Sequence, residues 1–487
     1  MAQGKRSKRK VKALPKSPTG IPGMDEITGG GLPKGRPTLV AGATGCGKTL
    51  FAMEFLVNGA IQYAEPGVFV AFEESTEELA QNVASLGFDL KELINQKKLI
   101  IDYVRIERSE IEETGAYDLE GLFIRLGHAI DTIGAKRVAV DTVEVLFSAL
   151  PNQAILRAEL QRLFRWLKDK GVSAVITAER GAGTMTRFGI EEYVADCVIL
   201  LDHRVTEQMS TRRLRIVKYR GTLHGTDEYP FLITKDGISV LPITSLGLDH
   251  KAPTGRVSTG VKELDDMLGG EGYHRGSTIL ISGTAGTGKS SLAAAFVDAA
   301  CRRGEHCLYF AFEESANQVL RNMRSIGIDL APHVKKGLLQ FHVARPSLYG
   351  LEMHLVTMHD LIKEYKPEIV VLDPITDFFV VGNNAEVKAA ITRIIDFLKT
   401  NQITALFTSY TDENAPNESV VGVSSLIDTW VSLRSLENHG ERQRGLFVLK
   451  SRGMAHSNQI RSLRLTNDGI KLGPMELLER QTNLNST

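Results

Sequence analysis

Two segments of the sequence have the residue types and spacing of a phosphate-binding loop. Residues 42–49 read GATGCGKT and residues 283–290 read GTAGTGKS, so both match G-x-x-x-x-G-K-[ST]. Glycines let backbone N–H groups surround phosphate oxygens, and the following helix directs its positive end toward them. We therefore predict two ATP sites. The predicted loop contacts are Gly42, Thr44, Gly45, Cys46, Gly47, Lys48 and Thr49, and Gly283, Thr284, Ala285, Gly286, Thr287, Gly288, Lys289 and Ser290.

The last two residues of each loop predict how ATP and its metal are held. Lys48 and Lys289 can reach the β- and γ-phosphates of ATP. The hydroxyls of Thr49 and Ser290 can ligate Mg²⁺. ATP and Mg²⁺ are therefore the predicted cofactors.

One aspartate in each half of the chain closes an apolar run. Asp141 ends RVAVD and Asp373 ends IVVLD, which is the Walker-B position near the metal. A carboxylate at the end of a buried strand is costly to desolvate unless it has a use, although an aspartate that starts a turn is the alternative. We predict that both aspartates bind the metal.

A pair of glutamates occurs twice, each time within AFEES. Glu73 with Glu74, and Glu313 with Glu314, follow an apolar run and precede a helical pattern. Favourable charge at a helix N-terminus is the alternative reading. The repetition beside the phosphates favours catalysis, since a glutamate there can polarise a water or hydroxyl for in-line attack. We predict all four as catalytic residues and Glu313 as a metal ligand as well.

A third repeated motif, K-x-R-G, lies far downstream of each loop. Lys218 and Arg220 belong to the first copy, and Lys450 and Arg452 belong to the second. In oligomeric ATPases such cations often reach a neighbour's nucleotide, where a cation supplied in trans contributes roughly 10³–10⁵ in rate. The alternative is a solvated cation pair at a strand end.

The elements that must position these motifs also occur twice. Corresponding motifs recur at an offset of 232 to 241 residues, which indicates two homologous domains. In each copy, short apolar runs such as PTLVAGA and SAVITAE alternate with helical patterns, for example over residues 50–64 and 154–170. We predict an α/β fold of two tandem RecA-like P-loop NTPase domains, each with a mostly parallel twisted sheet flanked by helices.

Domain limits follow from the repeat and from composition. The first domain is predicted over residues 19–245 and the second over 257–472, with a linker at 246–256 that is rich in Gly, Pro and charge. Residues 1–18 are predicted to be a basic flexible tail, and residues 473–487 a short C-terminal tail.

Composition restricts the location and partners of the chain. Lys plus Arg and Asp plus Glu both number 58, so no overall charge favours nucleic acid. No apolar run approaches the roughly 20 residues of a membrane helix. The four cysteines lack disulfide or zinc spacing, which suits a reducing compartment. We expect a cytoplasmic protein that binds neither membranes nor nucleic acid.

The combination of motifs resembles the KaiC family of circadian-clock ATPases and autokinases. The doubled P-loop, the paired glutamates and K-x-R-G-x-x-H in both halves carry the resemblance, which covers about residues 19–472. It implies a hexamer with nucleotides at subunit interfaces, a slow ATPase in the first domain and an autokinase with autophosphatase activity in the second. It also implies that the K-x-R cations approach ATP from the adjacent subunit. Further nucleotide contacts implied by position are Ser85, Thr222, His224, Ser325 and His456.

The resemblance places phosphorylation sites near the end of the second domain. Ser424 and Ser425 occupy the position of the family's acceptor pair, and Ser419 that of a third hydroxyl. From the residues alone, these serines read as ordinary helix-start residues. The first domain has Glu191 and Glu192 where the second has the serine pair, so a permanent charge in one copy matches a reversible charge in the other.

Partners and alternatives follow from the same resemblance. A KaiB-like partner is possible, but a KaiA-like activator is doubtful because only about seventeen residues follow Ile470. A RecA- or DnaB-like DNA motor is the runner-up, although no basic, aromatic loop is repeated in both halves. The third reading is a scaffold that ATP stabilises.

Overall fold

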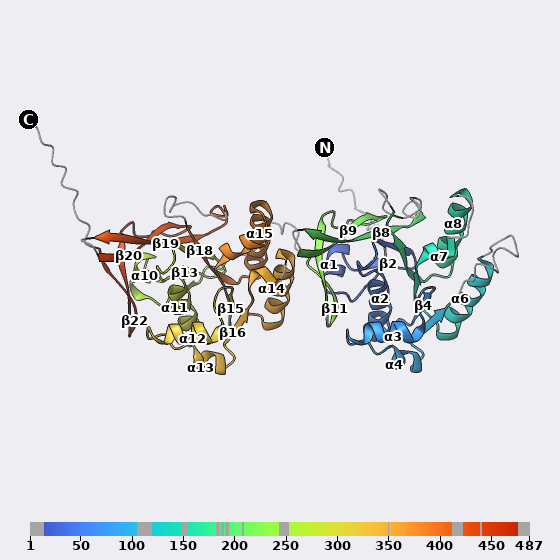
Figure 1. The fold of residues 1–487 in the computed structure, drawn as a ribbon, viewed down its shortest axis with the longest axis horizontal. Coiled ribbons are helices and arrows are strands. Elements are labelled where there is room, and N and C mark those ends of the chain that lie inside the picture. The colour runs from blue at the N-terminus through green and yellow to red at the C-terminus, as the bar shows by residue number, and fades with distance from the viewer. Residues whose placement is uncertain are drawn as a thin grey trace, which may run out of the picture. The chain divides into compact units, whose positions relative to one another are not determined.

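The computed structural model divides the chain into two compact units, residues 1–244 and 245–487 (Figure 1). It describes residues 14–104, 119–147, 153–181, 186, 189, 194–206, 209–242, 253–348, 350–411, 422–438 and 441–475. The predicted linker therefore falls partly outside the described residues.

A nine-stranded sheet forms the centre of the first unit, in the order β11-β10-β9-β8-β3-β7-β6-β4-β5. Neighbouring strands from β8 to β5 are parallel, and those from β8 to β11 are antiparallel. The strands are β3 (Pro37–Gly42), β4 (Gly67–Ala71), β5 (Leu99–Tyr103), β6 (Arg137–Asp141), β7 (Ser173–Glu179), β8 (Cys197–Thr206), β9 (Met209–Tyr219), β10 (Glu228–Thr234) and β11 (Gly237–Val240). A separate pair consists of β1 (Lys16–Ser17) and β2 (Leu32–Pro33).

The second unit repeats this topology, in the order β16-β15-β17-β18-β14-β19-β20-β21-β22. Its strands are β14 (Thr278–Gly283), β15 (Cys307–Ala311), β16 (Leu339–Val343), β17 (Ile369–Asp373), β18 (Thr404–Tyr410), β19 (Thr429–Asn438), β20 (Glu441–Ser451), β21 (Arg461–Thr466) and β22 (Gly469–Pro474). The short pair here is β12 (Arg256–Val257) with β13 (Tyr273–His274).

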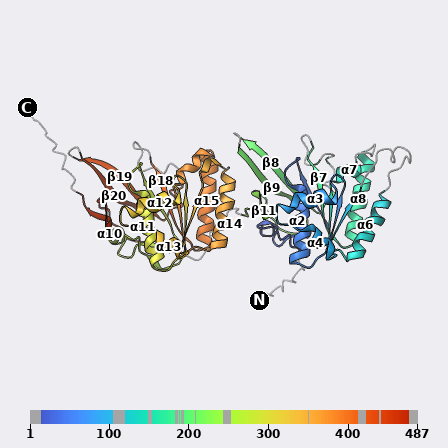
Figure 2. The same ribbon diagram turned by 60° about the horizontal axis from the view of Figure 1, so that its bottom comes forward.

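Helices cover both faces of each sheet, as the turned view shows (Figure 2). The first unit contains α1 (Met24–Thr28), α2 (Lys48–Gln62), α3 (Thr76–Ala84), α4 (Leu90–Asn95), α6 (Glu120–Ile133), α7 (Val143–Phe147) and α8 (Gln153–Asp169). The second contains α10 (Lys262–Met267), α11 (Lys289–Arg302), α12 (Ala316–Arg324), α13 (Ala331–Lys335), α14 (Leu351–Tyr365), α15 (Asn384–Thr400) and the 3₁₀ turns η1 (Pro346–Leu348) and η2 (Ile375–Val380).

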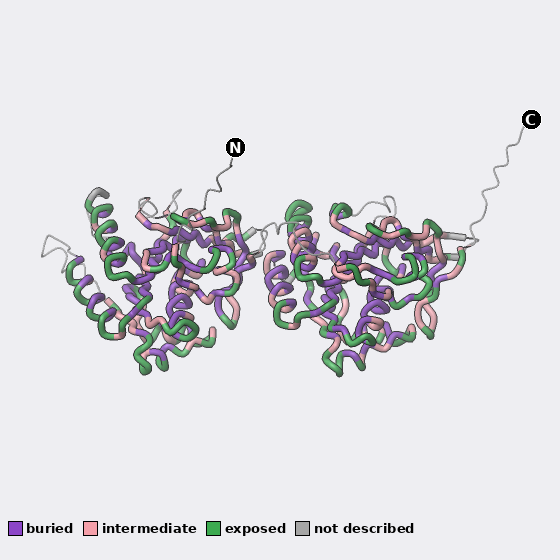
Figure 3. The backbone as a smooth tube through the Cα atoms, turned by 180° about the vertical axis from the view of Figure 1, so that it is seen from behind, coloured by how far each residue is buried: buried purple, intermediate pink, exposed green. Residues whose placement is uncertain are grey.

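The hydrophobic core of the first unit has two layers, one on each side of the sheet. Helices α2, α3 and α4 pack with one set of strand side chains, whereas α6 and α8 pack with the alternate set. Buried backbone is accordingly concentrated in the middle of each unit (Figure 3). Strands buried on both faces explain why the sequence shows continuous apolar runs there. The predicted fold class, two tandem α/β domains with mostly parallel sheets, is confirmed.

Candidate active sites

Each P-loop connects the central strand of its sheet to a buried helix. β3 ends at Gly42 and α2 begins at Lys48, while β14 ends at Gly283 and α11 begins at Lys289. The residue before each helix, Gly47 or Gly288, has a φ of 101° or 103°. A side chain would be strained in that conformation, so the loop needs glycine there.

The lysine of each loop lies inside the loop that it belongs to. The ammonium of Lys48 donates to the carbonyls of Gly42 and Ala43 at 2.9 and 3.0 Å. Lys289 donates to Gly283 and Thr284, both at 2.9 Å. Burial lowers the pKa of Lys289 to about 8, although Asp373 and Glu313 oppose the shift. A nearby phosphate would favour the charged form of this lysine.

The Walker-B aspartates end the strands that the sequence predicts. Asp141 accepts a hydrogen bond from Thr177 on β7 and another from Thr49 of the P-loop. Burial raises the pKa of Asp141, and these two hydrogen bonds oppose the increase. The structure thus brings a carboxylate and a hydroxyl, both predicted metal ligands, into contact. Such hard oxygen donors suit Mg²⁺ that also binds phosphate oxygens.

Asp373 has a similar but more crowded environment in the second unit. Its carboxylate accepts from Thr408 on β18, and from the hydroxyl of Tyr309 on β15 at 2.6 Å. In the first unit the residue at the Tyr309 position of the strand is Phe69. Ser290 follows Lys289 at the start of α11, so its place matches that of Thr49.

The two glutamates of each AFEES segment have different surroundings. Glu74 accepts from Asn82 of α3 at 3.2 Å, and Glu314 accepts from Asn322 of α12 at 3.2 Å. The second glutamate of each pair is therefore held by the helix that follows the loop.

The first glutamate of each pair faces the P-loop. Partial burial and the carboxylates of Asp141, Glu179 and Glu74 raise the pKa of Glu73, whereas Lys48 opposes the shift. In the second unit, the charges of Glu313 and Asp373 both act on Lys289. This arrangement supports Glu73 and Glu313 as the bases.

One site residue that the sequence did not predict lies at the carboxyl end of the strand beside each P-loop strand. Tyr410 of β18 pairs in register with Gly283, and Glu179 of β7 pairs with Gly42. The Tyr410 hydroxyl donates to Glu313 at 2.8 Å. Comparison of SAVITAE with TALFTSY could have revealed this exchange of an acid for a phenol.

The segment after the Walker-B aspartate carries its acidic residue at different positions in the two units. Burial and the charges of Glu313 and Asp373 raise the pKa of Asp377, in η2, to about 6. The residue that follows Asp141 by the same interval is Val145. The first unit has Glu144 instead, which accepts from the Glu179 N–H at 2.6 Å, so the two sites share a framework but place their acidic residues differently.

The K-x-R-G segments lie toward the amino ends of the parallel strands, whereas the P-loops follow the carboxyl ends. In the first unit Tyr219 pairs with Cys197, which is level with Thr38 near the start of β3, whereas Gly42 is level with Leu201. Four residues of strand separate these levels, a distance of roughly 13 Å. Lys218 and Arg220 therefore lie far from the P-loop of their own unit.

The second unit has the same arrangement. Lys450 pairs with Trp430, which is level with Leu280, three residues before the Gly283 end of β14 that leads into the P-loop. Arg220 lies 3.6 Å from Asp196, and Arg452 lies 3.9 Å from Asp428. The structure thus brings each P-loop, aspartate and glutamate together, but it does not bring the K-x-R cations to them.

The predicted acceptor serines lie with these cations. Ser424 and Ser425 are exposed in a turn just before β19. Lys450 donates to the Ser424 carbonyl at 2.9 Å, and Arg452 donates to the Ser425 carbonyl at 2.6 Å. Ser419, Glu191 and Glu192 lie outside the described residues.

The remaining predicted contacts fall into two groups. Ser85 and Ser325 are exposed at the ends of α3 and α12, after the glutamate loops. Thr222, His224 and His456 follow the K-x-R-G segments, and the His224 ring stacks on Tyr219 with centroids 6.2 Å apart. The second group therefore lies with the K-x-R cations, toward the amino ends of the parallel strands.

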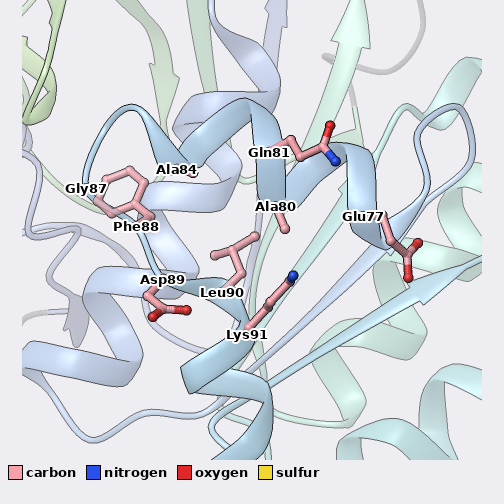
Figure 4. A pocket seen from close by; sticks show the side chains of 9 residues that line it. All are labelled: Glu77, Ala80, Gln81, Ala84, Gly87, Phe88, Asp89, Leu90 and Lys91. Carbon is pink, nitrogen blue, oxygen red and sulfur yellow. The ribbon is translucent and has the colours of Figure 1, made fainter.

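A pocket of about 500 Å³ lies between α3 and α4 of the first unit (Figure 4). Its lining contains none of the predicted site residues. The lining residues are Glu77, Ala80, Gln81, Ala84, Gly87, Phe88, Asp89, Leu90 and Lys91.

Comparisons with known proteins agree with this doubled site. A model of the family described as "ATPase: KaiC" matches residues 17–245 and 257–476. The chain belongs to the KaiC ATPase family. It is 57% identical to the "Circadian clock protein KaiC2" of Synechocystis sp. over 94% of this chain and 82% of the relative. It is 38% identical to the "Circadian clock oscillator protein KaiC" of Parathermosynechococcus lividus over 95% of this chain and 86% of that protein.

Membership of the KaiC family decides between the broad alternatives. The chain is a KaiC-like nucleotide-binding ATPase, and neither the DNA motor nor the scaffold is favoured. Among the described residues, no helix is long and apolar enough to span a bilayer.

Proposed function

We propose that this KaiC-family ATPase is also a serine autokinase and autophosphatase, active as an ATP-dependent hexameric ring. The first domain, residues 19–245, would hydrolyse ATP and assemble the ring. The second, residues 257–472, would transfer phosphate to Ser424 and Ser425, with Ser419 as a third acceptor. Residues 246–256 would link them. The predicted tails, residues 1–18 and 473–487, overlap the two domains, because Lys16–Ser17 pairs with β2 and β22 extends to Pro474.

The position of the acceptor serines carries this proposal. Ser424 and Ser425 precede β19, near the amino ends of the parallel strands of the second sheet. The P-loop and Glu313 lie at the carboxyl ends of these strands. A serine hydroxyl must come within hydrogen-bond reach of its base for proton transfer. The serines of one subunit therefore meet the ATP of an adjacent subunit, accompanied by Lys450 and Arg452.

The transfer step needs few groups. The serine oxygen bonds to the γ-phosphorus, its proton passes to Glu313, and the bond to the β–γ bridging oxygen breaks so that ADP leaves. Lys289 stabilises the phosphate charge, as Lys450 and Arg452 do from the other subunit. Mg²⁺ held by Ser290 and Asp373, with Glu313 nearby, would neutralise phosphate charge, and Thr49 with Asp141 would hold it in the first domain.

The first site would hydrolyse ATP with the same framework. Glu73 would accept a proton from the attacking water, while Glu74 holds the loop. Ser85, Thr222 and His224 in the first domain, and Ser325 and His456 in the second, would contact nucleotide at the subunit interfaces.

The names of the relatives support a role in timing or signalling. Proteins of both Synechocystis and Parathermosynechococcus in this family carry circadian-clock names. We propose a cytoplasmic protein with a KaiB-like partner.

Intact mass after incubation with Mg·ATP tests the kinase proposal directly. The expected result is a gain of one or two phosphates, mapped by phosphopeptides to Ser424 and Ser425. Ser424→Ala with Ser425→Ala is the matched control and should lose most of the gain. Phosphate only outside residues 419–425, or none at all, would contradict the proposal.

A further inference from the structure

Tyr410 connects two charged groups of the second active site. Its hydroxyl donates to the Oε2 atom of Glu313 at 2.8 Å. The Nζ atom of Lys289 lies 4.0 Å from the centroid of its ring. One side chain therefore contacts both the proposed base and the lysine that binds phosphate.

The strand register fixes this position. Tyr410 is the last residue of β18, and it pairs with Gly283, the last residue of β14 before the P-loop. Thr408, two residues earlier on the same face of the strand, donates to Asp373. Tyr410 thus belongs to the row of side chains that faces the metal and γ-phosphate positions.

In the first site, an acidic residue occupies the position that a phenol occupies in the second. Glu179 pairs with Gly42 in the same register. Its charge is one of the causes that raise the pKa of Glu73. A carboxylate repels the neighbouring base, whereas a phenol donates a hydrogen bond to it.

Several charged groups act on Glu313 from the surrounding elements. Its charge interacts with Lys289 of α11 and with Asp377 of η2, and Asp373 of β17 acts on the same two residues. Burial, the hydrogen bond to Glu313 and the charges of Asp373 and Asp377 raise the pKa of Tyr410. The phenol therefore keeps its proton and remains a donor to the carboxylate at neutral pH.

We propose that Tyr410 is a positioning residue that orients Glu313 for proton transfer in the second site. Its hydroxyl fixes one carboxylate oxygen and leaves the other to accept the proton of the attacking hydroxyl. Its ring holds Lys289 beside that carboxylate through a cation–π contact. The inference rests on the proposed function for the identity of the acceptor, but ATP turnover at this site reports it independently.

The test uses the full chain with Glu73→Gln and Glu74→Gln, so that ADP formation reports mainly the second site. Adding Tyr410→Phe removes the hydroxyl but keeps the ring over Lys289. We expect kcat for ADP formation to fall roughly tenfold, the scale of one hydrogen bond to a charged group, with KM for ATP nearly unchanged.

Two further variants separate positioning from packing. Tyr365→Phe removes a similar hydroxyl, which donates to the Gly337 carbonyl at 2.7 Å away from the site, and should leave kcat and KM unchanged. Tyr410→Leu removes ring and hydroxyl, so KM for ATP should rise in addition to the loss of kcat.

Three results would overturn the inference. The first is an unchanged or higher kcat in Tyr410→Phe, and the second is a change in KM alone. The third is the absence of ATP turnover by the second site in the parent, the full chain with Glu73→Gln and Glu74→Gln. If the Glu73→Gln/Glu74→Gln parent forms ADP but no phosphoserine, the autokinase proposal is rejected, while the comparison of kcat and KM still tests Tyr410.

Discussion

The ammonium of Lys450 donates to the backbone carbonyl of Ser424 at 2.9 Å. A predicted trans-acting cation and a predicted phosphate acceptor therefore form one local structure. A change of charge at Ser424 would act directly on Lys450, because a phosphoserine carries about −1.5 to −2 charge. Phosphorylation could then alter contacts between subunits through a local electrostatic change.

Assembly should depend on nucleotide in the first domain. Lys48→Ala removes the phosphate contact there and should leave the chain dissociated in saturating Mg·ATP, whereas Lys289→Ala, the matched change in the second domain, should still assemble. Light scattering of the native protein should give a mass near six times 53.5 kDa. A native protein that stays monomeric with Mg·ATP would contradict the proposed ring.

The two domains should differ in what they do with the γ-phosphate. Glu73→Gln with Glu74→Gln should suppress steady-state hydrolysis but leave phosphorylation possible. Glu313→Gln with Glu314→Gln should abolish phosphorylation, since only the second domain has the serine pair. Radiolabel incorporation and ADP release, measured together, check both. Unchanged incorporation in the second variant would reject the assignment.

Within each pair, the first glutamate should matter more. Glu74 is held by Asn82, so Glu74→Gln keeps an acceptor for that bond and should lower hydrolysis by roughly threefold or less. Glu73→Gln removes the base and should lower it by roughly 10²–10⁴. Initial rates of ADP release, with the second site silenced by Glu313→Gln, make the comparison. Equal losses in the two variants would show that the glutamates act as one unit.

As pH is lowered, hydrolysis by the first site should be lost at a higher pH than it would be with a base of ordinary glutamate pKa. The pKa of Glu73 is raised above 4.5, and the base works deprotonated, so activity is lost as pH falls through the raised pKa. Glu179→Gln removes one cause of the shift and should move this loss to lower pH. Glu77→Gln, at an exposed position of α3, is the control. A pH–rate profile between about pH 5 and pH 8 checks it, and an identical acid limb in Glu179→Gln would exclude this influence.

The fold and the P-loops could be predicted because their signals are local. Loop glycines, the lysine and the apolar strands follow one another at fixed spacing, and the repeat doubles the signal. Tyr410 could not be found in this way. It lies 121 residues beyond Lys289, and only the pairing of β14 with β18 makes them neighbours.

The separation of the serines from their own P-loop also needed the structure. The sequence shows that Ser424 and Lys450 are distant from Lys289 along the chain, but distance along the chain does not determine distance in space. The registers of β19 and β20 place both near the amino edge of the sheet. This distance from the P-loop of the same unit is a geometric argument for phosphate transfer between subunits, which the family resemblance alone implied.

Mixed rings test the central claim most directly. One chain carries Glu313→Gln with Glu314→Gln and can only accept phosphate. The other carries Ser419→Ala, Ser424→Ala and Ser425→Ala and can only donate it. Each alone should remain unphosphorylated in Mg·ATP. After the two are mixed and then given Mg·ATP, intact mass spectrometry should show phosphate on the acceptor-only chain, at Ser424 or Ser425. An acceptor-only chain that stays unmodified in mixed rings, while the native protein phosphorylates itself, would contradict transfer between subunits.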